Sequence, residues 1–390
     1  MTSFVLTPID ILTISIPALL FLIIQGYNLG LYSRILSHRN KSRKGRIPYT
    51  DQFPPLSIVL SAHDEAHHLR QLLPLLLEQD YPQFEVIVIN DNSTDNTEEV
   101  LKQLEDSHPN LYHSFTPSTA RYISRKKLSL TLGIKASRYD WLVFTEVDCR
   151  PASNQWLRTM ASNFTADTDI VLGYSGYAPH KGFRLANLAF NNLLLSLRYL
   201  SMALRRHTYM GCGRNLAYRK ELFYRNHGFS QQLNLKRGED DLFINQAATC
   251  SNTRVELSAA AATHIVPHNL HEHMTVRHDY HASSRYFKGS QRHVWAFETG
   301  VQLLYTIGTL ACILIGLLTG RWMVSAALGL LWMVKMLIQC ILFCRTAHAL
   351  GERHSYIFQS FFAYTWLLFE VTLVKSYCLF KGEREFRRNQ

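Results

Sequence analysis

The sequence predicts an α/β domain with helices on both faces of its sheet, flanked by hydrophobic helices that span a membrane. Three observations support this prediction. Short β-branched runs alternate with helical patterns in the middle of the chain, as in sheets built from strand–helix repeats. Long apolar segments with few or no charged residues lie near both ends of the chain. A pair of carboxylates follows one predicted strand, which places the candidate site at the carboxyl edge of the sheet.

Three strands are predicted in the first half of the domain, each a short apolar run that opens into a polar loop. The predicted strands are 56–61, 85–89 and 140–145, and the predicted helices include 69–78 and 126–137. A longer apolar helix at 185–204 contains Arg198 and several polar residues, so we expect it to pack on the domain or at the membrane interface. Residues 210–218 (MGCGRNLAY) predict a tight loop that leads into another helix.

Residues 11–31 form the first predicted membrane span. They include no Asp, Glu, Lys or Arg, and 21 residues can cross a hydrocarbon layer of about 30 Å at about 1.5 Å per residue. Six Lys or Arg residues follow between Arg34 and Arg46, whereas the only charged side chain before the span is Asp10. This order is the reverse of a cleaved signal peptide. We therefore expect an uncleaved anchor. Because Lys and Arg stay on the cytoplasmic side of a span, we also expect the domain to face the cytosol at the cell membrane.

Three further apolar segments near the end of the chain could each span the membrane: 301–319, 323–344 and 357–380. Three more crossings would place the basic tail outside, against the preference of Lys and Arg for the cytoplasmic side. Three explanations stay open. The last segment, which contains Glu370 and Lys375, lies in the interface or forms a re-entrant hairpin, or the orientation rule fails at this end.

These features divide the chain into six regions. They are an N-terminal transmembrane anchor (1–33), a basic juxtamembrane linker (34–54), the α/β domain (55–260), an amphipathic interface segment (261–300), C-terminal transmembrane or re-entrant helices (301–380) and a basic tail (381–390). The formal net charge is +11, but many basic residues flank the spans, where anionic lipids attract them. We therefore expect a membrane partner and no nucleic acid. The seven cysteines form no CxxC pair, which favours reduced thiols.

The strongest candidate site is the sequence LVFTEVDCRP, in which Glu146 and Asp148 follow a buried strand. Residues i and i+2 of an extended chain point the same way, and two carboxylates together suit a hard cation such as Mg²⁺ or Mn²⁺ with its bound diphosphate. Carboxylates at the end of a buried strand are costly unless they are solvated or bound to a cation. An acidic turn without a metal ion is the alternative.

Two further segments place polar side chains beside neighbouring strand ends. Asp91 can accept a hydrogen bond from a nucleobase or a ribose hydroxyl, and Glu65 follows the adjacent strand. Both residues would also suit a helix cap. Lys126, at the start of a predicted helix, can contact a diphosphate, although a solvated lysine is the alternative.

Two segments later in the chain also attract attention. In GEDDLF, the acids Glu239, Asp240 and Asp241 precede an apolar helix; one of them can act as a general base, or all three can be a charged first helical turn. Residues 264–293 hold seven of the eighteen histidines, among them His268, His271, His273, His278 and His281, but their spacing matches no metal site and favours an amphipathic surface segment. Arg292, shortly before a predicted span, can bind a diphosphate from the membrane side.

In order and spacing, these motifs resemble family 2 glycosyltransferases of the GT-A fold, in particular membrane-anchored bacterial members, from about residue 56 to 295. LSIVLSAHDEA is similar to the opening strand and its S-x-N-E loop, with Asp64 in place of Asn. VINDNSTDNT is similar to the nucleotide-binding segment, with Asn90 in place of the first acid, and RKKLSLTLGIKAS to the lysine-bearing helix. TEVDCRP resembles the DxD element, with Glu146 in place of the first Asp.

The later motifs resemble the acceptor side of the same family. GCGRNLAYRKELF is similar to its acceptor-side loop, and RGEDDLF to the acidic segment that carries the base, which implies Asp240 for that role with Glu239 or Asp241 in support. QRHVW matches the Q-x-x-R-W element of processive synthases only in part, because Val294 stands where its Arg would be.

The resemblance implies a Rossmann-like mixed sheet and an inverting transfer from a nucleoside diphosphate sugar. Asp148 and Glu146 would hold Mg²⁺ or Mn²⁺, and Asp240 would take the proton of the acceptor hydroxyl. Glu65, Asp91, Lys126 and Arg292 would bind the nucleotide, of which a UDP-sugar is the expected donor. A lipid-linked or cell-envelope glycan is the expected acceptor. Two alternatives stay open: a processive polysaccharide synthase, and a non-catalytic membrane scaffold or sugar-nucleotide sensor.

Overall fold

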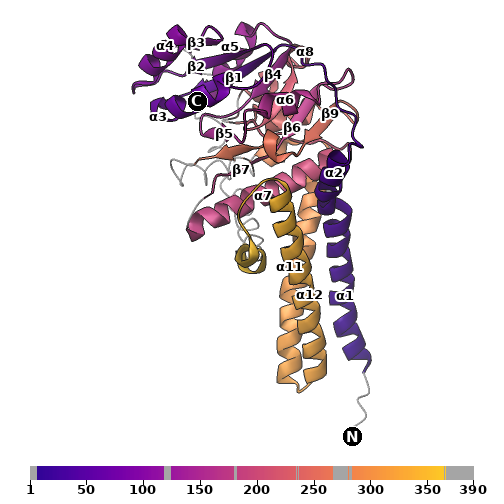
Figure 1. Cartoon of the computed structure of the whole chain (residues 1–390). Helices are drawn as coiled ribbons and strands as arrows, with labels where there is room; N and C mark the ends of the chain where they lie inside the picture. The colour runs from indigo at the N-terminus through magenta and orange to yellow at the C-terminus, as the bar shows by residue number, and fades with distance from the viewer. Residues whose placement is uncertain are drawn as a thin grey trace.

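The computed structural model describes residues 7–117, 124–179, 182–233, 235, 237–266, 280, 283–363 and 365, with the side chains of Gln291, Arg292 and Ala363 left out. An α/β domain lies at one end, and three long helices run side by side away from it (Figure 1). The predicted tail 381–390 lies outside the described residues, as does most of the last apolar segment.

The domain is built on a seven-stranded mixed sheet in the order β3-β2-β1-β4-β8-β6-β9. Its strands are β1 (Leu56–Ala62), β2 (Phe84–Asn90), β3 (Leu111–Phe115), β4 (Trp141–Phe144), β6 (Ile170–Gly173), β8 (Leu216–Arg219) and β9 (Thr253–Glu256). Strands β3, β2, β1 and β4 are parallel, whereas β8 runs antiparallel to both β4 and β6. The three strands predicted from the sequence are confirmed, and they lie next to one another as β2, β1 and β4.

Strand β8 differs from the sequence prediction, which placed residues 210–218 in a loop before a helix. Residues Leu216–Arg219 instead form a strand in the middle of the sheet, followed at once by the predicted helix α8 (Lys220–Arg225). Only four residues belong to this strand. So short an apolar run gives little periodic signal, and pairing with β4 and β6 decides its conformation.

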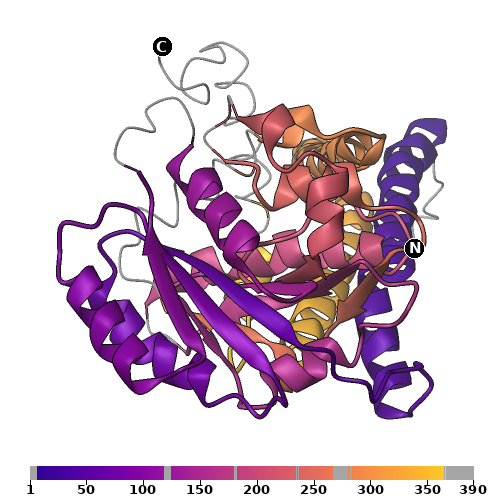
Figure 2. The ribbon, with the colours of Figure 1, turned by 90° about the horizontal axis from the view of Figure 1, so that it is seen from above.

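Helices cover both faces of the sheet (Figure 2). Successive side chains of β1 point to opposite faces of the sheet. Ile58 and Leu60 pack in one hydrophobic core with helices α3 (Ala66–Leu77) and α4 (Thr97–Ser107), and Val59 packs in the other core with α5 (Arg125–Ala136). The helices of the domain are α3 (Ala66–Leu77), α4 (Thr97–Ser107), α5 (Arg125–Ala136), α6 (Trp156–Ala161), α7 (Phe183–Ala203), α8 and α9 (Asp241–Ala247), with short 3₁₀ turns η2 (Ser230–Gln232), η3 (Ala259–Ala261) and η4 (Ser284–Tyr286).

A second, three-stranded sheet fixes the segment that follows β4. Its strands are β5 (Cys149–Pro151), β10 (Thr263–Ile265) and β7 (Ser175–Tyr177), in the order β5-β10-β7. Strand β10 lies inside the region 261–300 that the sequence analysis assigned to an interface segment. The amide of Val266 donates to the carbonyl of Asp148 (2.8 Å), so this small sheet holds the backbone of the predicted metal ligand in place.

Three helices in the described part of the chain are long and apolar enough to cross a membrane. The first comprises α1 (Pro8–Tyr27), a π-helical turn η1 (Asn28–Tyr32) and α2 (Ser33–Arg43); the others are α11 (Gln291–Leu318) and α12 (Trp322–Ala349). The first helix therefore continues into the region predicted as a basic linker. A second π-helical turn, η5 (Gln359–Ala363), lies within the last predicted apolar segment.

Helix α7 lies between the domain and the three long helices (Figure 1). Twelve of its 21 residues are buried, which confirms that this apolar helix packs on the domain. Its Arg198 pairs with Glu298 of α11 (3.0 Å), and Tyr32 of η1 donates to the same carboxylate (2.6 Å). This ion pair, with its buried carboxylate, joins the α/β domain to two of the candidate spans.

Candidate active site

A cavity of about 260 Å³ opens at the carboxyl ends of β1, β2 and β4. Seven of the residues predicted from the sequence line it: Glu65, Asp91, Lys126, Glu146, Asp148, Glu239 and Asp240. They come from strand ends, from the first turn of α5 and from the turn before α9, segments far apart in the sequence. The spatial convergence that the site requires is therefore present, and Asp148 and Asp240 share one cavity.

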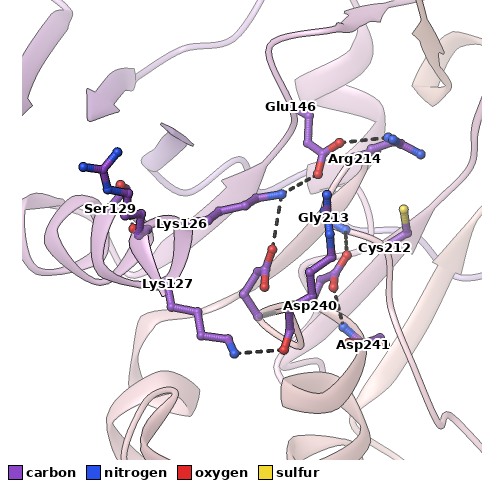
Figure 3. A network of polar contacts seen from close by, with 12 residues as sticks. Lys126, Lys127, Ser129, Glu146, Cys212, Gly213, Arg214, Asp240 and Asp241 are labelled. Atoms are coloured by element: carbon purple, nitrogen blue, oxygen red, sulfur yellow. Dashed lines mark hydrogen bonds and ion pairs between the residues drawn. The ribbon is translucent and has the colours of Figure 1, made fainter. Parts of the chain in front are cut away.

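Glu146 lies between two cations, as Figure 3 shows. Its Oε1 is 2.6 Å from the Nζ of Lys126, and its Oε2 accepts from the Nε of Arg214 at 2.9 Å. Burial alone would raise the pKa of Glu146, but Lys126 and Arg214 outweigh burial and hold that pKa well below its usual range. Burial alone would lower the pKa of Lys126, but the negative charges of Glu146 and Glu239 raise it above its usual value. Lys126 and Glu146 are therefore both charged at neutral pH.

Glu146 and Asp148 fit a divalent cation. Together with Cys149, their ligand atoms lie within 4.8 Å of one another. Burial raises the pKa of the Cys149 thiol well above its usual value, so the thiol stays protonated and donates to Oδ1 of Asp148 (3.1 Å). A hard cation such as Mg²⁺ or Mn²⁺ prefers carboxylate oxygen to a neutral thiol, so the donor set selects Glu146 and Asp148.

Asp240 also lines the cavity, and hydrogen bonds hold its carboxylate in a fixed orientation. Its Oδ2 accepts from the backbone amide of Gly213 (2.8 Å) and from the hydroxyl of Tyr280 (2.6 Å), and its Oδ1 accepts from the amide of Asp241 (2.8 Å). Burial and the neighbouring Glu239 raise the pKa of Asp240. A carboxylate with a raised pKa is a stronger base, as proton removal from a hydroxyl requires.

The two acids beside Asp240 take different positions. Glu239 lines the cavity and pairs with Lys126 (3.3 Å). Asp241 does not line the cavity; it is buried in the first turn of α9 and accepts a hydrogen bond from the hydroxyl of Ser283. Asp240 is also the N-cap of this short helix, and Asp241 lies in its first turn. Asp240 thus combines a position at the start of a helix with a place in the cavity.

Asp91 and Glu65, the two residues predicted to bind the nucleotide, also line the cavity. Asp91 accepts from the hydroxyl of Thr116 (2.7 Å), and α4 begins only at Thr97, so Asp91 is not a helix cap. Glu65 stands at the N-cap position of α3 but makes no capping bond with its side chain, which instead contacts Nδ1 of His68 (2.5 Å). Neither carboxylate serves the capping role that the sequence left open.

The structure adds residues that the sequence analysis did not name. His63, His68, Arg214 and Arg237 also line the cavity. The only sequence signal for Arg214 is its position beside the glycines of the acceptor-side motif, and the pairing with Glu146 is a tertiary contact. The side chain of Arg292 and the histidines 268, 271, 273, 278 and 281 lie outside the described residues.

Comparison with known proteins bears on the family and the fold of the domain. Residues 57–226 match the model of the glycosyl transferase family 2. A mannosyltransferase from Pyrobaculum calidifontis, solved with GDP-Man and Mn²⁺, has the same fold, with a TM-score of 0.56 and 15% identity over 94% of this chain and all of that one. The α/β domain therefore has the GT-A fold, and its residues 57–226 match family 2 glycosyltransferases.

Two curated relatives match parts of this domain. A poly-beta-1,6-N-acetyl-D-glucosamine synthase of Staphylococcus epidermidis is 27% identical over 97 residues, which are 25% of this chain and 22% of the relative. The glycosyltransferase AglE of Haloferax volcanii is 28% identical over 128 residues, which are 32% of this chain and 40% of the relative. The match thus spans less than half the length of either relative.

Proposed function

We propose that the protein is a membrane-bound inverting glycosyltransferase that moves a sugar from a nucleoside diphosphate sugar, expected to be a UDP-sugar, to a lipid-linked or cell-envelope glycan acceptor. The observation that carries the proposal is the shared cavity of Asp148 and Asp240. An attack on the anomeric carbon with departure of the diphosphate requires a metal ligand and a base that face one cavity.

The charges in the cavity support a divalent cation. Six carboxylates line it, those of Glu65, Asp91, Glu146, Asp148, Glu239 and Asp240, against the three permanent cations of Lys126, Arg214 and Arg237. A dinegative diphosphate would meet strong repulsion there unless Mg²⁺ or Mn²⁺ bound beside Asp148. When bound, the cation would supply Lewis-acid stabilisation of the leaving diphosphate.

The residues of this chain divide the remaining work. Lys126, at the first turn of α5, adds positive charge beside the diphosphate, and Asp91 orients the nucleoside through its carboxylate. Asp240 accepts the proton of the attacking acceptor hydroxyl, and the hydrogen bonds from Gly213 and Tyr280 hold its carboxylate in position. The product is a glycoside of inverted anomeric configuration and a nucleoside diphosphate.

The membrane setting supports an acceptor that is itself tied to the membrane. The three candidate spans lie directly below the domain, and the basic residues after the first span favour the cytosolic side for the cavity, where nucleotide sugars are made (Figure 1). Processive synthesis is the second candidate, because a relative is named a poly-N-acetylglucosamine synthase. Product length separates the two: one added sugar or a long polymer.

A donor screen tests the proposal. The full chain, purified in detergent or lipid nanodiscs, is incubated with UDP-, GDP- and dTDP-sugars, with Mg²⁺, Mn²⁺ or chelator, and release of nucleoside diphosphate is measured. We expect release from at least one donor that depends on the added metal and increases with membrane lipid extract as acceptor. Binding of a nucleotide sugar without transfer or hydrolysis under every condition would instead support a sensor or scaffold.

A further inference from the structure

Lys127 is the most completely buried cation of the α/β domain among the described residues, and it does not reach the cavity. Its Nζ donates to three backbone carbonyls, those of Gln232 (2.6 Å), Leu235 (2.7 Å) and Arg237 (2.8 Å). An ammonium group has three hydrogens, so each of them has an acceptor. Successive residues of a helix point about 100° apart, which is why Lys126 faces Glu146 while Lys127 points away from it (Figure 3).

The three carbonyls belong to the segment that leads to the proposed base. Arg237 is followed by Gly238, whose φ of +118° is rarely open to other residues, and then by Glu239 and Asp240. The side chain of Leu242 packs where a Cβ at Gly238 would lie, at 2.6 Å. Helix α9 itself has only seven residues, so it gives this turn little support of its own.

We propose that Lys127 is a positioning residue: by binding the carbonyls of Gln232, Leu235 and Arg237, it fixes the turn that presents Asp240 to the acceptor hydroxyl. The inference rests on the proposed function. Lys126 and Lys127 then hold the same segment from two sides, Lys126 through the carboxylate of Glu239 and Lys127 through the backbone. Displacement of Asp240 by about 1 Å would be enough to slow transfer about 100-fold.

The protonation state of Lys127 provides a readout that a merely structural role would not give. Burial lowers the pKa of Lys127 to about 8, against the opposing charges of Glu239, Asp241 and Asp240, which face it from the turn and from α9. As pH rises through this value, Nζ keeps two hydrogens for three carbonyls. We therefore expect kcat to fall as pH rises through about 8, whereas an arginine at this position stays charged far above it.

The experiment compares Lys127→Met and Lys127→Arg with the wild-type chain, and with Lys135→Met as a control on an exposed lysine of the same helix. With the donor and acceptor found in the screen, we expect Lys127→Met to lower kcat about 100-fold while the KM for the donor changes by about threefold or less. Lys127→Arg should recover part of kcat and lose the alkaline decrease. Amide hydrogen exchange should increase over residues 237–247 in Lys127→Met and stay unchanged in the control.

The possible outcomes separate the two proposals. A folded Lys127→Met protein with wild-type kcat would overturn the positioning role and leave the proposed function intact. A wild-type chain that transfers no sugar from any donor would overturn the proposed function itself. If Lys127→Met does not fold, the pH profile of Lys127→Arg decides: an alkaline decrease at the wild-type pH would exclude Lys127 as its origin and overturn the inference.

Discussion

Lys126 of α5 and Glu146, two residues beyond the end of β4, form an ion pair with 2.6 Å between Nζ and Oε1. The pair links the predicted diphosphate-binding lysine to the predicted metal-binding acid. A bound cation beside Glu146 would compete with Lys126 for the carboxylate and release the ammonium group toward the diphosphate. Metal and nucleotide should therefore bind with positive cooperativity.

The first prediction concerns Lys126. Lys126→Met removes a charged hydrogen-bond donor from the diphosphate, so we expect the Kd for the nucleoside diphosphate to increase about 10–100-fold. Calorimetric titration with and without Mn²⁺ measures this change. Lys135→Met, on the exposed face of the same helix, should bind as the wild type does. Equal affinity in Lys126→Met and wild type would remove Lys126 from the nucleotide site.

The second prediction concerns the base. Asp240→Asn keeps an oxygen that can accept the amide hydrogen of Gly213 but cannot take a proton, so transfer should fall about 100- to 10,000-fold while nucleotide binding is retained. In the wild type, kcat should fall as pH decreases through the raised pKa of Asp240, because the carboxylate must be ionised to act. The matched control is Asp169→Asn, whose carboxylate pairs with Arg219 and Arg225 outside the cavity. Normal turnover of Asp240→Asn would exclude it as base.

The third prediction concerns the metal. Chelator should abolish release of nucleoside diphosphate, and Asp148→Asn should weaken Mn²⁺ binding about 10–100-fold, because a neutral amide replaces a charged oxygen ligand. Electron paramagnetic resonance of Mn²⁺ measures binding without turnover. The exposed Asp167→Asn serves as the control. Unchanged Mn²⁺ affinity in Asp148→Asn would place any metal elsewhere.

The fourth prediction concerns Glu352, just after α12, which is buried against the domain and accepts a hydrogen bond from the Tyr174 hydroxyl. Burial raises its pKa to about 7, from 4.5. The folded chain therefore binds more protons than the unfolded chain between these values, and stability should fall as pH rises from about 4.5 to about 7, by on the order of 1–3 kcal/mol. Thermal unfolding in detergent should show this in the wild type and in Glu221→Gln, an exposed control, and less in Glu352→Gln. An unchanged pH dependence in Glu352→Gln would exclude Glu352 as its source.

The sequence by itself determined the parts of this protein that depend on local pattern. The apolar stretch before Arg34 predicts a membrane-spanning helix, because a helix satisfies all its backbone hydrogen bonds internally in a lipid environment that offers none. The strands 56–61, 85–89 and 140–145 follow from β-branched composition, and their parallel order brings Glu65, Asp91 and Asp148 to one edge of the sheet. To predict that these three residues lie close together, only the rule that parallel strands end at the same edge of a sheet is needed.

Only the tertiary structure decided what depends on contacts between distant segments. Strand β8 becomes a strand because β4 and β6 pair with it, and Arg214 enters the cavity because β8 follows it. Lys126 and Lys127 are adjacent and chemically alike in sequence, yet the helix turns one to the cavity and buries the other under three carbonyls. Composition and spacing give Asp240 and Asp241 equal claims to the role of base, and packing turns Asp241 towards Ser283 and leaves Asp240 facing the cavity.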